Sequence, residues 1–340
     1  MSQSSTPSTK SLLSAPVLIG GGIAWGVISL LFSLLFVPSG GNEPADWFVL
    51  GINLLETGAF LIASLLCFRN WRSPQIVSGR TVWFWIGLGL LMYAFGNVFF
   101  FLWGNLWGLD PVVSFGDFFY ILSYVFLSVG MFQAVLPRRL NLELSQWLIV
   151  LGIGLAGILL SVFVSMQAAS AEFLPLEATP SAPSTYLLAQ EPTPPEAPPE
   201  APPEAPAVEP APVTAPVVEP PSTAPSWAVA IDNLLEPFEE IVKLLYLLGD
   251  IVLLIIAGTL LVAFWGGRFS QSWKLIAVAA FFLYLADMFF LYAGSTDTYQ
   301  EGSTVWEVFW TLAAVFFWLG AVVEHAISVN SRRSSRRRRG

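Results

Sequence analysis

The sequence predicts an all-α integral membrane protein with eight transmembrane helices, arranged as two parallel four-helix repeats (4+4). Three observations lead to this fold class: the composition, the number of long apolar stretches and the placement of the cations. Of the 340 residues, 55% are hydrophobic and only 11% are charged, and the mean hydropathy is +0.67. A soluble domain carries roughly 25% charged residues, so most of this chain is expected to lie in lipid.

Eight apolar stretches are long enough to cross a bilayer, for which a helix needs about 20 residues. Lipid offers the backbone no hydrogen-bond partners, so each stretch is expected to be an α-helix. The expected spans cover residues 16–37, 47–68, 82–103, 113–135, 145–166, 239–265, 273–293 and 305–327.

The lysines and arginines occupy alternate connections between these spans. They precede the first span and follow every second one, and the other connections contain none, apart from Lys243 at the start of span 6. Fourteen of the fifteen cations therefore fall on one side, which the positive-inside rule assigns to the cytoplasm. Both termini are expected there, in a bacterial inner (plasma) membrane or a thylakoid membrane.

A proline-rich and acidic segment, residues 167–232, separates spans 5 and 6. Proline has a fixed φ and no amide donor, so this segment is expected to be an extended polyproline II chain and not a folded domain. The predicted orientation places it outside the cytoplasm. It is interpreted either as a disordered spacer or as a ligand for an aromatic groove of a partner protein.

An internal repeat divides the chain. After a shift of 190 residues, spans 3 and 4 align without a gap on spans 7 and 8, so that Trp83 meets Trp273 and Gly130 meets Gly320. Four spans return the chain to its starting side, so the two copies are expected to be parallel. The predicted parts are a cytoplasmic N-terminus (1–15), a four-span repeat (16–139), span 5 (140–166), the Pro-rich loop (167–232), spans 6–8 that complete the second repeat (233–327) and a basic cytoplasmic tail (328–340).

Polar side chains recur at matching positions of the two copies, in the half of the membrane that faces away from the cytoplasm. Charged groups are costly in lipid, so these side chains are expected to point into the protein. Each copy is expected to gather its own set within its own half. A structural polar network, an outward-facing ligand pocket and a path for cations or protons are the three interpretations. The candidate residues are Glu56, Asn97 and Asp117, their counterparts Asp250, Asp287 and Glu307, and Tyr120 and Tyr124 on the same stripe of span 4 as Asp117.

The sequence contains no phosphate-binding loop, metal-spaced histidine cluster or nucleophile–base pair, so no enzyme activity, cofactor or metal site is predicted. The single cysteine, Cys67, is expected to be a packing residue. A membrane-protein partner or a second copy of the chain is expected, and nucleic acid is not. The tail is expected to bind anionic lipid at about 1 kcal/mol per cation, through Arg332, Arg333, Arg336, Arg337, Arg338 and Arg339.

A two-part motif lies within residues 83–131. Residues 96–99 read Gly-Asn-Val-Phe at the end of one span, and residues 114–124 read Ser-Phe-Gly-Asp-Phe-Phe-Tyr-Ile-Leu-Ser-Tyr at the start of the next. This stretch resembles the N-terminal membrane modules of some bacterial diguanylate cyclases and sensor kinases, here without an output domain. Asn97 stands where those modules have an acid, and Asp287 supplies the acid in the second copy. The resemblance implies a sensory or ligand-binding membrane module.

Three classes of function follow from these patterns. The first is a non-enzymatic multi-pass protein that acts as a sensory, ligand-binding or scaffolding module through helix–helix contacts. The second is a small transporter or channel for a solute or cation that uses the intramembrane carboxylates. The third is an assembly factor for a membrane complex.

Overall fold

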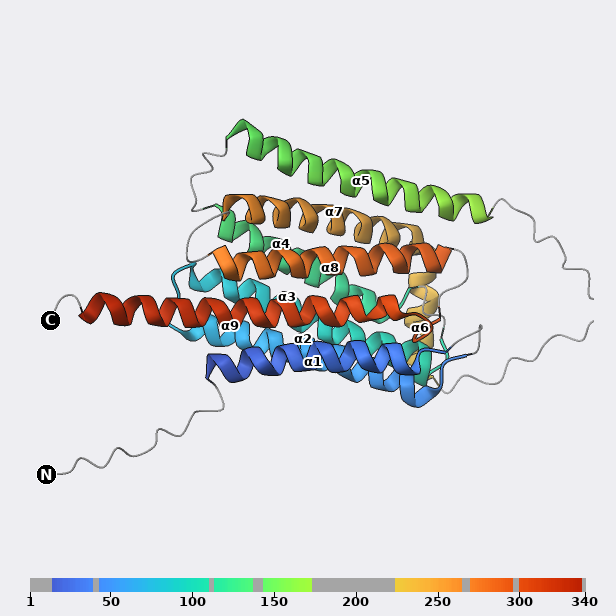
Figure 1. Cartoon of the computed structure of the whole chain (residues 1–340). Coiled ribbons are helices and arrows are strands. Elements are labelled where there is room, and N and C mark those ends of the chain that lie inside the picture. Colours follow the sequence, from blue (N-terminus) through green and yellow to red (C-terminus); the bar gives the residue numbers. More distant parts are fainter. Residues whose placement is uncertain are drawn as a thin grey trace, which may run out of the picture. The chain divides into compact units, whose positions relative to one another are not determined.

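A computed structural model describes residues 14–38, 43–109, 113–136, 143–172, 224–264, 270–295 and 300–337 (Figure 1). These described residues are almost entirely helical and contain no β-strand. Most of the proline-rich segment lies outside the described residues.

Among the described residues, eight helices are long and apolar enough to cross a membrane, as the sequence predicts. Their ends lie within a few residues of the predicted ones except in α5 and α9, which both run further. The eight are α1 (Ala15–Phe36), α2 (Asp46–Arg72), α3 (Arg80–Phe101), α4 (Phe115–Val135), α5 (Leu144–Glu172), α7 (Glu239–Ala263), α8 (Ser270–Ser295) and α9 (Val308–Arg337).

A short ninth helix, α6 (Ser226–Leu235), differs from the predicted extended segment. It leads through one 3₁₀ turn, Glu236–Phe238, into α7. A hydrogen bond anchors it, because the indole nitrogen of Trp103 donates to the carboxylate of Asp232 at 2.7 Å. The predicted loop of 167–232 is therefore too long at both ends, since α5 reaches Glu172 and α6 begins at Ser226.

Six of the helices pack in a closed order. Along the order α2, α3, α4, α7, α8, α9, each helix packs against the next, and α9 packs back against α2. The other two long helices are peripheral: α1 packs on α2 and α9, and α5 packs on α7 and α8 (Figure 1). Many large apolar side chains on the outer faces are exposed, such as Leu35 of α1 and Leu151 of α5, as expected of surfaces that meet lipid.

Small residues allow close helix contacts at equivalent places in the two halves. A Cβ added at Gly130 of α4 would lie 2.7 Å from the side chain of Ile86 of α3. A Cβ added at Gly320 of α9 would lie equally close to the side chain of Ile276 of α8. Without a strong hydrophobic drive between helices in lipid, such glycine contacts are a main source of helix association.

Large side chains fill the bundle interior toward the end where α3 and α8 begin. The rings of Trp83 and Trp273 lie 5.7 Å apart, and both side chains are almost fully buried, as are Leu90 and Ile276. Tryptophan at a span end often lies at the headgroup level with its ring toward lipid, but the side chains of Trp83, Trp273 and Trp103 are buried inside the protein. Contacts between helices, which span boundaries do not reveal, hold them there.

Candidate functional site

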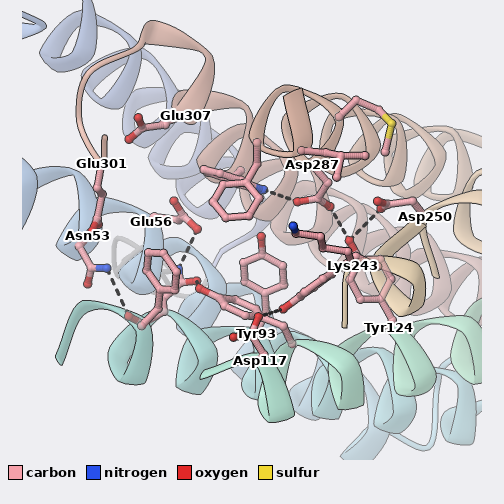
Figure 2. Close-up of a pocket in the computed structure, with 18 of the residues that line it drawn as sticks. Asn53, Glu56, Tyr93, Asp117, Tyr124, Lys243, Asp250, Asp287, Glu301 and Glu307 are labelled. Atoms are coloured by element: carbon pink, nitrogen blue, oxygen red, sulfur yellow. Dashed lines mark hydrogen bonds between the residues drawn. The ribbon is translucent and has the colours of Figure 1, made fainter. Parts of the chain in front are cut away.

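A cavity of about 110 Å³ lies among α2, α3, α4, α7, α8 and α9 (Figure 2). It is near the end of the bundle where α4 and α9 begin, because residues from the first turns of both helices line it. All eight candidate residues from the sequence line this one cavity. A site for one water needs roughly 10–15 Å³ on this scale, so the cavity has room for several waters or a small ligand.

Three residues of the first half form a hydrogen-bonded chain on the cavity wall. The Asn97 amide nitrogen on α3 donates to the Glu56 carboxylate on α2 at 2.8 Å. The Tyr120 hydroxyl on α4 donates to the Asn97 amide oxygen at 2.7 Å. The amide thus uses its donor and its acceptor at once, which holds α2, α3 and α4 in register.

Asp117 lies at the start of α4 and caps that helix. Its Oδ2 accepts from the backbone N–H of Ser114 at 2.6 Å and from the Ser114 hydroxyl at 3.0 Å, in a capping box. Its Oδ1 accepts from the hydroxyl of Tyr246 on α7 at 2.5 Å. A carboxylate here is stabilised by the positive end of the helix dipole as well as by these donors.

The second half holds a carboxyl pair around one tyrosine. The Tyr124 hydroxyl on α4 lies 2.8 Å from Asp250 Oδ1 on α7 and 2.5 Å from Asp287 Oδ2 on α8. Figure 2 shows Tyr124 between the two acids. The other oxygen of Asp287 accepts from the indole nitrogen of Trp310 on α9 at 2.7 Å.

Glu307 ends a 3₁₀ turn, Val305–Glu307, that precedes α9. Its carboxylate accepts from the backbone N–H of Gly302 at 2.8 Å and from the Thr304 hydroxyl at 3.4 Å. Gly302 has a φ of 81°, a conformation that glycine adopts without strain. Glu307 therefore closes the turn before α9 much as Asp117 caps α4.

The sequence prediction missed Glu301, a sixth acid that lines the cavity. It lies in the connection between α8 and α9, where no helical periodicity marks an inward position. Its carboxylate accepts from the Asn105 amide at 2.5 Å. Burial raises the pKa of Glu301 from its ordinary 4.5 to about 7, although hydrogen bonds from Asn105 and Asn53 act in the opposite direction.

The charge balance of the cavity wall is strongly acidic. Six carboxyl groups and one cation, Lys243, line it. The ammonium of Lys243 pairs with Glu239 at 2.5 Å and with Glu240 at 3.3 Å, two acids outside the wall, so its charge is largely offset. The aromatic rings of Tyr93 and Trp310 also line the cavity. The wall therefore favours a positively charged occupant.

The structure corrects one expectation about these residues. The two polar sets do not occupy separate pockets, each within its own half. Tyr124 of the first half bonds to Asp250 and Asp287 of the second, and Tyr246 of the second bonds to Asp117 of the first. Sequence alignment pairs equivalent residues, but it cannot tell whether two equivalent sites merge across their interface.

Cys67 does not line the cavity. Cys67 is fully buried on α2, in a packed apolar cluster. The arginines of the tail belong to the last turns of α9 or follow it, beyond the side chains that the structure describes. Within the described part of the chain, no three Asp, Glu, His or Cys side chains are grouped closely enough to hold a metal ion.

Comparison with known proteins identifies no relative. No known protein family, no curated protein and no solved structure matches the chain.

Proposed function

We propose that this protein is a non-enzymatic membrane module that binds a small ligand in the acidic cavity and passes the binding event to a partner through helix contacts. One observation carries the proposal: eight polar residues predicted from sequence, on five helices and the turn that precedes a sixth, meet on the wall of a single cavity. A purely structural network would be expected to leave no cavity between its side chains. This one leaves room for several waters or a ligand.

The packing below the cavity favours binding over a permanently open channel. Trp83, Trp273, Leu90 and Ile276 are all at most 1% exposed and occupy the interior of the closed helix order. A channel needs a continuous polar path, whereas this part of the bundle is filled with apolar side chains. The cavity is therefore interpreted as a pocket with one closed end.

The proposal includes a parallel 4+4 repeat with its axis along the membrane normal. The contacts of the six inner helices support it: α2–α3 and α3–α4 have the counterparts α7–α8 and α8–α9, and α2–α9 has the counterpart α7–α4. The outer helices differ, since α1 packs on α2 and α9, whereas α5 packs on α7 and α8. The hydrogen bonds Tyr120–Asn97 and Trp310–Asp287 also correspond, both at 2.7 Å. The pairs Trp83–Trp273 and Phe100–Phe290, each made of two equivalent residues, are in ring contact, as expected beside a two-fold axis.

The proposed orientation places the cavity on the non-cytoplasmic side, with both termini in the cytoplasm. Cations support it, since Arg69, Arg72 and Arg80 lie at the opposite end, where α2 ends and α3 begins. An impermeant thiol reagent should reach cysteines introduced at Asn105 in intact cells and spare those introduced at Ser78. Reaction of the cysteine at position 78 (Ser78→Cys) from outside would mean that the orientation is the opposite of the proposed one. The same scan tests the proposed non-cytoplasmic Pro-rich segment with a cysteine at Pro202.

Two features favour a sensory role for the pocket. Residues 83–131 resemble the membrane modules of bacterial sensor proteins, and they contribute Tyr93, Asn97 and Tyr120 to the wall. In addition, Tyr124 and Tyr246 bond across the two halves, so a ligand that changes either bond acts on both halves at once. Such a shared contact is what a signalling element needs in order to convert binding into a helix movement.

A cavity-filling variant tests ligand binding. Leu247 of α7 lines the cavity, whereas its neighbour Leu248 is 50% exposed on the outer face. A small-molecule extract of the cells that make the protein should raise the melting temperature of the purified wild type and of Leu248→Trp, but not of Leu247→Trp. A ligand that binds only the folded protein stabilises it, and the stabilisation grows with the ratio of ligand concentration to Kd. An extract without effect on the wild type, or with an equal effect on Leu247→Trp, would remove the proposed function.

A second function, transport of a small solute or cation, is favoured by the two-fold contact pattern, which is common in transporters. Transport requires a second conformation in which the Trp83–Trp273 end opens. Uptake of a bound solute into liposomes that contain the protein, and loss of uptake in Leu247→Trp, would favour it. Binding without uptake, together with a stoichiometric partner copurified in gentle detergent, would favour the sensory module.

A further inference from the structure

The hydrogen-bond contacts around Tyr124 need more protons than this tyrosine supplies. Its hydroxyl has one proton and lies at hydrogen-bond distance from two carboxyl groups, Asp250 and Asp287. If both acids were ionised, one of the close oxygen–oxygen contacts would have no proton between its atoms. The group of three therefore holds one proton more than the tyrosine supplies.

The first half provides the comparison. Glu56 corresponds to Asp250, and Asn97 corresponds to Asp287. The Asn97 amide donates its own N–H to the Glu56 carboxylate, so this pair needs no additional proton. At the equivalent place the second half has an acid where the first has an amide. The second half therefore needs a hydrogen-bond donor that neither of its two acidic side chains supplies when both are ionised.

Asp250 marks where that donor belongs. Its side chain is 1% exposed and lines the cavity. Its Oδ2 receives no N–H or O–H from the described residues when both acids are ionised. A buried carboxylate oxygen without a donor is strongly unfavourable, so it must take a shared proton or a donor from an occupant of the cavity.

The surrounding residues select the kind of occupant. The rings of Tyr93, Tyr124, Tyr246 and Trp310 face the same space, and aromatic faces attract organic cations. Lys243 could otherwise supply an ammonium from within the protein, but Glu239 and Glu240 hold it. An organic ammonium with N–H groups satisfies both requirements, because it carries the charge and supplies the missing donor.

We propose that the Asp250–Asp287 pair binds the ammonium group of a small organic amine in exchange for one proton. The protonated pair releases a proton to water, and the two carboxylates then accept N–H bonds from the ammonium, while Tyr124 keeps one of its contacts. No covalent bond forms or breaks. The proposal rests on the cavity being the ligand site proposed above and names the class of its ligand.

The exchange fixes the direction of the pH dependence. While the pair holds its proton, amine affinity should rise about tenfold per pH unit, and it should level off once the pair is ionised. The pair titrates as a unit. The other titratable groups that face the cavity are Glu56 of α2, Tyr93 of α3, Asp117 of α4, Lys243 and Tyr246 of α7, and Glu301 and Glu307 at the entry to α9.

The test compares two isomeric cations by titration calorimetry of the full-length protein in detergent. n-Butylammonium and tetramethylammonium have the same formula and charge, but only the former has N–H donors. n-Butylammonium should bind saturably and release about one proton, measured from the heat in buffers of different ionisation enthalpy. Tetramethylammonium should bind at least about tenfold more weakly, since it leaves Asp250 Oδ2 without a donor.

Asp287→Asn is the decisive variant, because it gives the second half the amide of the first. It should fold with an unchanged or higher melting temperature, bind n-butylammonium at least about tenfold more weakly, and release no proton. Asp46→Asn, an identical change at an exposed site at the start of α2, is the matched control and should behave as the wild type.

Three results would overturn the proposal. These are absence of saturable n-butylammonium binding between acid and alkaline pH, equal affinity for the two cations, and proton release by Asp287→Asn. Lys243→Gln tests a rival explanation, in which the ammonium of Lys243 itself binds the two carboxylates. If only this variant binds the amine, the rival explanation holds. If one of these results is found, but the cell extract still stabilises the wild type and has no effect on Leu247→Trp, then the proposed ligand class is wrong and the proposed binding function stands.

Discussion

Tyr120 and Trp310 are equivalent residues, and each donates a 2.7 Å hydrogen bond to the residue 23 positions earlier. The acceptors differ: Asn97 has donors of its own, and Asp287 has none when ionised. A single change of amide to acid thus separates a satisfied pair from one that needs a proton or a ligand. At the scale of residues, the chemistry of the cavity depends on which groups can donate.

Asp117 provides a test of hydrogen bonding against charge. Asp117→Asn keeps one carbonyl oxygen that can accept from the Ser114 backbone, so the melting temperature should fall only slightly. Asp117→Leu leaves the Ser114 N–H and the Tyr246 hydroxyl without an acceptor, which should cost about 2–3 kcal/mol. Denaturant unfolding of the two variants measures the difference. Equal losses would mean that the charge, and not the hydrogen bonds, stabilises the start of α4.

Glu301 predicts a pH dependence of stability. Its pKa is about 7 in the folded protein against an ordinary 4.5, so the unfolded chain loses the proton first as pH rises. Stability should therefore fall between about pH 4.5 and pH 7, and Glu301→Gln should remove that part of the loss, roughly 3 kcal/mol. The variant should melt above the wild type at pH 8 and close to it at pH 4. A difference that does not change with pH would contradict the burial of this acid.

At the scale of elements, the sequence predicted the transmembrane helices, which the bilayer requires. It missed the elements that depend on contacts within the folded protein. Eight long apolar stretches became eight helices, because a span in lipid has no other stable conformation. The π-helical turn Leu102–Leu106 and the helix α6 were not predicted. Both depend on tertiary contacts: Trp103 of the π turn binds Asp232 of α6, and Trp107 packs on Trp227.

The anchoring of α6 can be tested through one hydrogen bond. Asp232→Ala removes the acceptor for the Trp103 indole, whereas Asp232→Asn retains an oxygen that can accept it. Amide hydrogen exchange across Ser226–Leu235 should become faster in the alanine variant and stay near the wild-type rate in the asparagine variant. If both variants exchange like the wild type, the ring contacts of Trp227 suffice to hold the helix.

At the scale of the whole molecule, the sequence predicted the wall residues but not their assembly. Periodicity and cost in lipid indicated which side chains point inward, and all of those candidates line the cavity. Their partners were not predictable, because α4 meets α7 and α2 meets α9 only after the chain has folded. Glu301 escaped prediction because a loop residue carries no inward or outward periodicity.

Equivalent glycines test whether the two halves pack alike. Gly130→Ala would place a Cβ 2.7 Å from a side-chain atom of Ile86 and 2.9 Å from its backbone, so it should lose about 1–3 kcal/mol. Gly320→Ala meets Ile276 at 2.7 Å but through the flexible end of that side chain, so it should lose less. Gly152→Ala on α5 meets nothing within 4 Å and should be neutral or stabilising. Melting temperatures in one detergent give the order, and a loss at Gly152 equal to that at Gly130 would contradict it.

The difference between Asn97 and Asp287 also explains what a single chain gains over an assembly of two. Two identical four-span chains around a two-fold axis must carry the same residue at both positions, so they would offer either two amides or two acids. Linking the halves covalently frees each position to change without the other. Here the Asn97–Glu56 pair of the first half forms its own hydrogen bond, whereas Asp250 Oδ2 of the second half has no donor among the described residues. Under the proposed binding function, the cavity would accept one ligand in one orientation, where a symmetric pair would offer two indistinguishable ones.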